Sequence, residues 1–132
     1  MSMFAVGCYT KHSSIDARGK GVTIVEWNDG DDSRRILGQG GEITNPTYLD
    51  WQASGRVLYA VSETDERQGA VAAYALSAAG ELEWLGQETG TGRPACHLTV
   101  RPELQRIFAA SYSGGSLSSF GYASGGVGPA VF

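Results

Sequence analysis

The sequence predicts an all-β protein assembled from a repeated unit of strands. Three observations support this prediction: the sequence repeats itself at a shift of 49 residues, it is rich in glycine, and it lacks helical periodicity. Glycine accounts for 19 of the 132 residues, about twice its usual share of ~7%, which favours many tight turns. No segment repeats its apolar residues with the period of a helix. Short strands joined by turns should therefore make up the chain.

The repeat is clearest between residues 45 and 120. When Leu49 is placed on Leu98, the two copies align without a gap over two strands. Four further pairs in this frame are Leu58 with Ile107, Tyr59 with Phe108, Ala60 with Ala109 and Ser62 with Ser111. After a loop that is shorter in the second copy, Gly69, Val71 and Tyr74 correspond to Gly115, Leu117 and Phe120. A period of about 50 residues is typical of repeat architectures.

The expected strands fall into three groups, each rich in β-branched and aromatic residues and bounded by turn residues. The first group comprises residues 4–9, 21–27 and 35–38. The second comprises residues 47–51, 57–62, 69–76 and 82–87. The third comprises residues 96–100, 107–112 and 116–122, with a fourth strand expected to begin near Val127.

Four-stranded units of this length, two of which open with a proline, are typical of propeller blades. A β-sandwich is the alternative, but it requires no four-strand period. We expect a partial first blade at about 3–41, a second at about 45–90 and an incomplete third at about 93–132, all within one domain. About two and a half blades cannot close a ring of four to eight. The open sheet edges would favour self-association.

Composition argues against several classes of partner. The formal net charge is −4 and the sequence has no basic run, so nucleic acid is not expected as a partner. No apolar run approaches the ~18 residues of a membrane span, and residues 4–9 lack the basic flank of a signal peptide. Cys8 and Cys96 have no metal-ligand spacing around them, which indicates buried, reduced thiols. We therefore expect a cytoplasmic protein.

An acidic cluster at Asp29, Asp31 and Asp32 is similar to half of a calcium-binding loop. It lacks the downstream glutamate that such a loop needs as a bidentate ligand. We interpret the cluster as a turn, and we expect no metal site.

Candidate site residues lie where the repeat departs from its own pattern. Tyr48 corresponds to His97, and Glu63 corresponds to Tyr112. These positions fall at the start of one strand and at the end of the strand beside it. We therefore expect Tyr48 beside Glu63, and His97 beside Tyr112, at one end of the propeller. Arg93, just before Pro94, is a further candidate for contact with an anionic substrate.

Each candidate also has a purely structural interpretation. His97 is compatible with a hydrogen-bonded structural histidine. The two tyrosines are compatible with packing residues whose hydroxyls reach the rim of a pocket. Glu63 begins a charged run that reads as a solvated loop, and Arg93 fits an ordinary surface arginine.

Several segments resemble the lactonase family of seven-bladed β-propellers. These segments are GCYT at 7–10, NPTYL at 45–49, GRVLYAVSE at 55–63, PACHLTV at 94–100 and ASYSGGS at 110–116. The resemblance covers essentially the whole chain and implies the N-terminal part of such a propeller. It implies hydrolysis of a small lactone, most typically 6-phosphogluconolactone in the cytosolic pentose phosphate route, without a metal or another cofactor.

The resemblance also implies a reaction type and roles for residues. Water must attack a lactone carbonyl while a His or Glu takes its proton and an Arg stabilises the oxyanion. The resemblance places Tyr48, Glu63, His97 and Tyr112 around the axis, in substrate-binding roles, with His97 a candidate base. The family's main catalytic candidates belong to later blades, so we expect this chain to be inactive alone. A non-catalytic propeller that binds a protein or sugar through its loops, and a truncated relic without function, are the alternatives.

Overall fold

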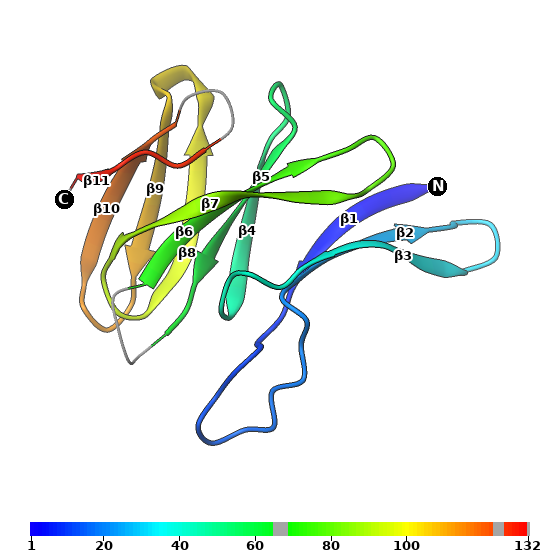
Figure 1. Cartoon of the computed structure of the whole chain (residues 1–132), viewed down its shortest axis with the longest axis horizontal. Coiled ribbons are helices and arrows are strands. Elements are labelled where there is room, and N and C mark those ends of the chain that lie inside the picture. Colours follow the sequence, from blue (N-terminus) through cyan, green and yellow to red (C-terminus); the bar gives the residue numbers. More distant parts are fainter. Residues whose placement is uncertain (65–68, 123–125, 132) are drawn as a thin grey trace.

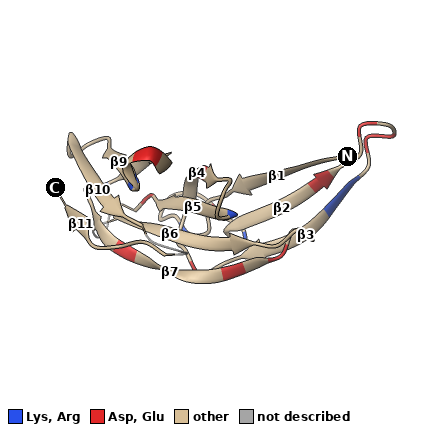
Figure 2. Cartoon of the chain, turned by 90° about the horizontal axis from the view of Figure 1, so that it is seen from above, with Lys and Arg blue, Asp and Glu red and all other residues tan. Residues whose placement is uncertain are grey.

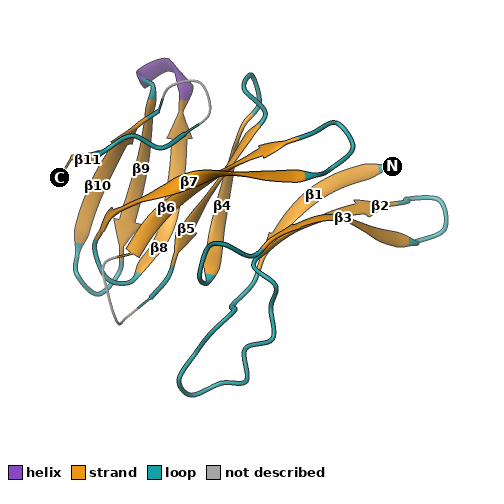
Figure 3. Cartoon of the chain, in the orientation of Figure 1, coloured by secondary structure: helices purple, strands orange, loops and turns teal. Residues whose placement is uncertain are grey.

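The computed structural model describes residues 1–64, 69–122 and 126–131. Within them the chain forms three antiparallel sheets that lie side by side (Figure 1). The only helix among these residues is one short 3₁₀ turn, Pro102–Leu104 (Figure 3). The all-β prediction is therefore confirmed, and the three separate sheets fit the predicted repeat of strand units better than the two sheets of a sandwich.

The first sheet has three strands in the order β1-β2-β3. They are β1 (Ser2–Gly7), β2 (Val22–Trp27) and β3 (Arg34–Gly40). In the described part of the chain, β1 pairs with β2 and no strand covers its other edge.

The second and third sheets have four strands each, and each runs in chain order from one edge to the other. The second contains β4 (Pro46–Gln52), β5 (Val57–Ser62), β6 (Gly69–Leu76) and β7 (Leu82–Thr91). The third contains β8 (Ala95–Arg101), β9 (Arg106–Ser111), β10 (Ser116–Gly121) and β11 (Ala130–Val131). The strand groups expected from the sequence therefore form separate sheets.

Most strand boundaries lie within two residues of the expected ones, and two differ by more. β7 continues past residue 87 to Thr91, because Glu88, Thr89 and Thr91 still pair with the first residues of β6 across a bulge. β11 begins at Ala130 rather than near Val127. Pro129 has no N–H to give to a ladder, and the Gly128 N–H instead bonds the carbonyl of Gly121 at 2.6 Å.

The 49-residue repeat is reproduced in the strand register. Tyr48 pairs with Val61 in the second sheet, as His97 pairs with Ala110 in the third. A bulge precedes both positions, between Pro46 and Tyr48 and between Ala95 and His97. The hairpin ends also match, because the Glu63 N–H bonds the Asn45 carbonyl at 3.1 Å and the Tyr112 N–H bonds the Pro94 carbonyl at 3.0 Å.

The first sheet joins the same scheme through β1. Gly7 pairs with Val22, just as Val61 pairs with Val71 and Ala110 pairs with Leu117. The residues two positions further along are Tyr9, Glu63 and Tyr112. These three residues therefore occupy one equivalent position, just past the end of the corresponding strand in each sheet.

The middle sheet supplies the core on both of its faces. Side chains of a strand alternate between faces, and every residue of β5 is buried. Leu58 and Ala60 join the apolar cluster shared with the first sheet, whereas Val57, Tyr59 and Val61 join the cluster shared with the third sheet. The middle sheet thus buries apolar side chains against both of its neighbours, as an inner unit of a stack must.

Two buried tyrosines mark these cores. Tyr59 and Tyr74 are both fully buried. Burial raises the pKa of Tyr59 to about 12, and the neighbouring Tyr122 adds to this effect. Burial also raises the pKa of Tyr74 well above its usual range.

The inner strands of the second and third sheets are joined by one carboxylate. β4 contacts β8 directly. Asp50 on β4 accepts a hydrogen bond from the Val100 backbone N–H on β8 at 2.7 Å. An N–H on the open edge of β8 is thereby satisfied.

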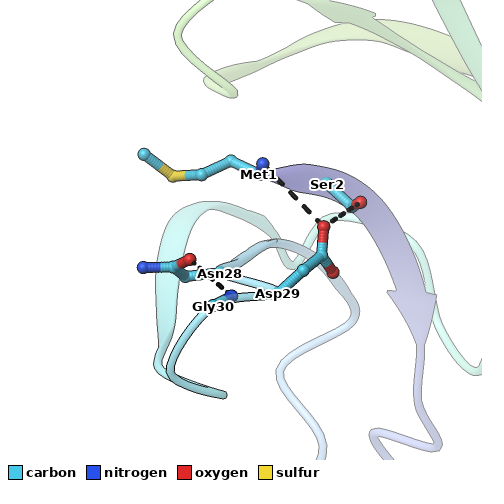
Figure 4. A network of polar contacts seen from close by, with 5 residues as sticks. All are labelled: Met1, Ser2, Asn28, Asp29 and Gly30. Atoms are coloured by element: carbon cyan, nitrogen blue, oxygen red, sulfur yellow. Dashed lines mark hydrogen bonds and ion pairs between the residues drawn. The ribbon is translucent and has the colours of Figure 1, made fainter.

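The acidic cluster is a turn, as expected. Asp29 accepts a hydrogen bond from the Ser2 hydroxyl at 3.4 Å and lies 3.9 Å from the N-terminal amine (Figure 4). Hydrogen bonds from Ser33 hold the pKa of Asp31 below its usual value. Figure 2 shows this acidic turn at one end of the molecule. Across the described ranges, no group of three or more His, Cys, Asp and Glu residues is arranged to hold a metal.

Cys8 and Cys96 are free thiols in this structure, and both are partly exposed rather than buried as expected. No helix within the described ranges has the length and apolar character of a membrane span.

Candidate functional site

The candidate residues gather at one end of the three sheets. β4 and β8 begin there, β5 and β9 end there, and the long loop that follows β1 extends beyond them at the lower edge of Figure 1. The strand directions therefore place these residues at one end of the sheets, as the repeat predicts. The partners of the individual side chains differ from those expected.

Glu63 is held by two hydroxyl groups. Its Oε1 accepts a hydrogen bond from the Tyr9 hydroxyl at 2.9 Å, and its Oε2 accepts one from the Thr47 hydroxyl at 2.6 Å. Tyr9 lies just after β1 of the first sheet, so this carboxylate turns toward that sheet. Gly7 allows the close approach, because a Cβ there would overlap the carbonyl oxygen of Pro46.

Tyr48 turns the other way, toward the third sheet. Its ring lies on that of His97, with 4.2 Å between the ring centroids and an interplanar angle of 46°. The expected pairs within one sheet, Tyr48 with Glu63 and His97 with Tyr112, were therefore wrong as to partners. The bulge explains the error: it inserts Thr47 as an extra residue, and Thr47 rather than Tyr48 bonds Glu63.

The remaining candidates are on the surface of the third sheet. Tyr112 is 82% exposed, so in this chain it is not a packing residue. The Arg93 side chain is also exposed, and its carbonyl accepts a hydrogen bond from the Gly114 N–H at 3.1 Å. His97 is exposed as well, although its ring contacts that of Tyr48. The charged run after Glu63 continues into residues outside the described ranges.

Asn45 ties the first sheet to the second at this end. It is 5% exposed and has a positive φ of 47°, a conformation that asparagine tolerates better than most residues. Its Oδ1 accepts hydrogen bonds from the backbone N–H groups of Thr10 and Lys11, both at 2.9 Å. Its Nδ2 donates to the carbonyl of Glu63 at 3.0 Å. One buried amide thus fixes the loop after β1 relative to Glu63.

A polar cleft of about 170 Å³ opens between these two segments. Its lining consists of Tyr9, Lys11, His12, Ser13, Thr44, Asn45, Glu63 and Thr64. The lining offers a carboxylate, an amine, an imidazole and several hydroxyls. Such groups suit a ligand rich in hydroxyls better than an apolar one.

Sequence reasoning missed most of this cleft. Glu63 was a candidate, but Tyr9, Lys11, His12 and Asn45 were not. The available signal was the position of Tyr9, which is equivalent to Glu63 and Tyr112 once the first sheet is included in the repeat.

Comparison with known proteins extends over nearly the whole chain. The family model described as "Lactonase, 7-bladed beta-propeller" matches residues 3–131. The 6-phosphogluconolactonase of Bacillus subtilis (strain 168) is 30% identical over 119 residues, which cover 87% of this chain and 32% of that protein.

Solved structures agree with this match. A candidate 6-phosphogluconolactonase from Bacteroides fragilis superposes with a TM-score of 0.83 at 32% identity, covering 97% of this chain and 34% of its own. A second candidate, from Bacteroides uniformis, gives a TM-score of 0.84 at 27% identity over 98% of this chain and 36% of its own.

The chain spans about a third of the length of these relatives. Its three sheets correspond to blades, of which the family has seven. Within the described ranges the first sheet has three strands where the other two have four, and the last strand of the third sheet is short. On its sequence, its strand register and its fold, this chain belongs to the lactonase family of seven-bladed β-propellers.

Proposed function

We propose that this chain is part of a propeller that hydrolyses a small lactone, with 6-phosphogluconolactone as the substrate and 6-phosphogluconate as the product. The similarity to the B. subtilis 6-phosphogluconolactonase is the observation that carries the proposal. The polar lining of the cleft beside Glu63 also supports it, since a sugar-derived lactone carries several hydroxyl groups.

The site of a lactone hydrolase must perform three tasks. A base takes a proton from the attacking water, a donor or cation stabilises the oxyanion, and further groups hold the substrate. We assign substrate-binding roles to Tyr48, Glu63, His97 and Tyr112, which lie at one end of the blades. Arg93 is suited to the phosphate, because a guanidinium binds phosphate oxygens in a bidentate manner.

His97 is the candidate base within this chain. Its imidazole is exposed and its ring is oriented by contact with Tyr48. An imidazole can accept a proton near neutral pH without a metal or another cofactor. Because the chain corresponds to about a third of its relatives, we expect it to be inactive alone and active only within a closed ring.

We further place the reaction in the cytoplasm, within the pentose phosphate route. The free thiols of Cys8 and Cys96 support a reducing compartment. Separation of cytoplasmic from exported protein, followed by immunoblotting, tests this placement. Recovery of the protein outside the cytoplasm would refute it.

A chimera tests the function. This chain replaces the matching segment of the B. subtilis 6-phosphogluconolactonase, and hydrolysis of 6-phosphogluconolactone is measured for the chimera and for the 132-residue chain. We expect the chimera to keep kcat/KM within about tenfold of the parent enzyme, a change of ~1.4 kcal/mol in the barrier. We expect the chain alone to show only the uncatalysed rate.

The exposed Lys20 provides a control, since Lys20→Ala should leave the chimera's rate unchanged, whereas His97→Ala should lower it. A chimera that folds, as judged by its thermal unfolding, but hydrolyses no lactone would refute the proposed function. Turnover by the chain alone that His97→Ala abolishes would refute the expectation that the chain is inactive.

A further inference from the structure

We propose that the cleft between Glu63 and the loop after β1 binds a sugar acid, with the Glu63 carboxylate accepting hydrogen bonds from two neighbouring hydroxyls. The choice of a sugar acid rests on the proposed lactonase function. The choice of the cleft and its residues rests on the structure. Lys11, His12 and Asn45, which sequence analysis did not single out, take part in this site.

The Glu63 carboxylate can accept more hydrogen bonds than the described residues donate to it. An ionised carboxylate can accept about four hydrogen bonds, two on each oxygen. The Tyr9 hydroxyl bonds Oε1 and the Thr47 hydroxyl bonds Oε2. Counted over the described residues, these bonds hold the group in place and leave about one further acceptor position on each oxygen. Two adjacent hydroxyls of a sugar chain can donate to the two oxygens together.

The walls of the cleft are fixed before a ligand arrives. The Asn45 side chain bonds the backbone of Thr10 and Lys11 on one wall and the Glu63 carbonyl on the other. The Asn45 N–H also donates to the Thr10 hydroxyl at 3.2 Å. Preorganisation of this kind reduces the entropy lost on binding.

His12 supplies a donor on the loop side. Its Nδ1 accepts a hydrogen bond from the backbone N–H of Ser14 at 3.1 Å. Because a backbone N–H can only donate, Nδ1 carries no proton and the neutral ring carries its proton on Nε2. The Tyr9 ring packs edge-on against the imidazole at 5.6 Å between centroids. The ring is thus fixed as an N–H donor for a ligand oxygen.

The charges of the lining favour a molecule that has both hydroxyls and an acidic group. The Lys11 ammonium can attract the acidic group, and the Glu63 carboxylate repels it. A simple anion therefore gains little here, whereas a sugar acid can direct its hydroxyls to Glu63 and its acid group to Lys11. The volume of about 170 Å³ is more than ten times the ~10–15 Å³ needed for one water. A small organic ligand can therefore enter.

The experiment is a titration of the isotope-labelled 132-residue chain with D-gluconate, followed by NMR. We expect saturable shifts of the Thr10 and Lys11 amides and of the Asn45 side-chain amide. Glu63→Gln should weaken gluconate binding at least about tenfold, since it removes a charged acceptor. The control Glu103→Gln, at an exposed carboxylate in the turn after β8, should leave the affinity unchanged.

Two further probes test the ligand chemistry. D-Glucitol, which has the hydroxyls without the acid group, should shift the same amides with lower affinity. Inorganic phosphate should not shift them. Equal responses to phosphate and gluconate, no shift with gluconate, or equal binding by the Glu63→Gln variant would each overturn the proposal. If the chain does not stay in solution, the same comparison of variants is made by calorimetry in the chimera.

The outcome is separable from that of the proposed function. A chimera that hydrolyses lactone although gluconate leaves the cleft amides unshifted would refute only this inference. An inactive but folded chimera whose cleft binds gluconate through Glu63 would refute only the proposed function.

Discussion

The second and third blades begin with the same backbone and present different chemistry. The β4–β5 and β8–β9 hairpins share their register, their bulge and their terminal hydrogen bond. At equivalent positions one has Tyr48 and Glu63, and the other has His97 and Tyr112. The shared features are those that a blade needs in order to pack. Tyr48, Glu63, His97 and Tyr112 lie at the same end of the sheets, and this is where we place the site.

The difference extends to the link that enters each blade. Asn45 enters the second blade and is buried among hydrogen bonds to the first. Pro94 occupies the equivalent position in the third blade and has no side-chain donor or acceptor. The cleft therefore forms at the junction of the first and second blades, because only that junction has the asparagine to hold its loop among the residues described.

Truncation of Tyr59 is expected to have the largest effect on stability. Tyr59 is fully buried between the second and third blades, and loss of such a ring costs about 3–5 kcal/mol. The equivalent Phe108 is only partly buried in this chain, so Phe108→Ala should cost roughly half as much. Urea unfolding of the two alanine variants measures the difference. Equal losses would show that the two faces are packed alike and would contradict the comparison.

Asn45→Ala should have the next largest effect. The change leaves the Thr10 and Lys11 N–H groups without their acceptor and places alanine at a positive φ, so we expect a loss of about 2 kcal/mol or more. Pro94→Ala, at the equivalent position, should cost only ~0.4–1 kcal/mol through the unfolded state. Urea denaturation measures both variants. A smaller loss for Asn45→Ala than for Pro94→Ala would argue against the tie between the first two blades.

The paired serines give the smallest and most discriminating effect. The Ser62 hydroxyl donates to the Thr44 carbonyl at 2.7 Å, whereas the equivalent Ser111 hydroxyl is buried without a partner among the described residues. Ser62→Ala should therefore cost about 1 kcal/mol, and Ser111→Ala should be neutral or stabilising. Thermal unfolding of the two variants, side by side, checks the sign. Destabilisation by Ser111→Ala would show that the Ser111 hydroxyl makes a stabilising hydrogen bond, which would contradict the comparison.

The backbone of the blades could be predicted from the sequence because packing dictates it. β5 (Val57–Ser62) and β6 (Gly69–Leu76) have the bounds expected from their apolar runs. β7 was underestimated because its last residues, Glu88 to Thr91, are polar or glycine, although they still pair with β6. Local composition carries no signal for pairing that a neighbouring strand imposes.

The location of the candidate site residues could be predicted from the sequence, but the side chains that they contact could not. Comparison of the repeats located Tyr48, Glu63, His97 and Tyr112 at one end of the blades. It could not show that a bulge brings Thr47 to Glu63 and leaves Tyr48 to contact His97 in the next blade. A one-residue bulge reverses the face to which later side chains point, and it leaves no mark in the composition of the strand.

The most direct test exchanges the chemistry between equivalent positions. In the chimera with the B. subtilis enzyme, Glu63→Tyr gives the second blade the residue that the third blade has at Tyr112. We predict that the unaltered chimera hydrolyses 6-phosphogluconolactone, while the Glu63→Tyr chimera still folds cooperatively and loses at least about tenfold in kcat/KM. A folded Glu63→Tyr chimera with unchanged kcat/KM would contradict the assignment of site chemistry to the positions where the blades differ.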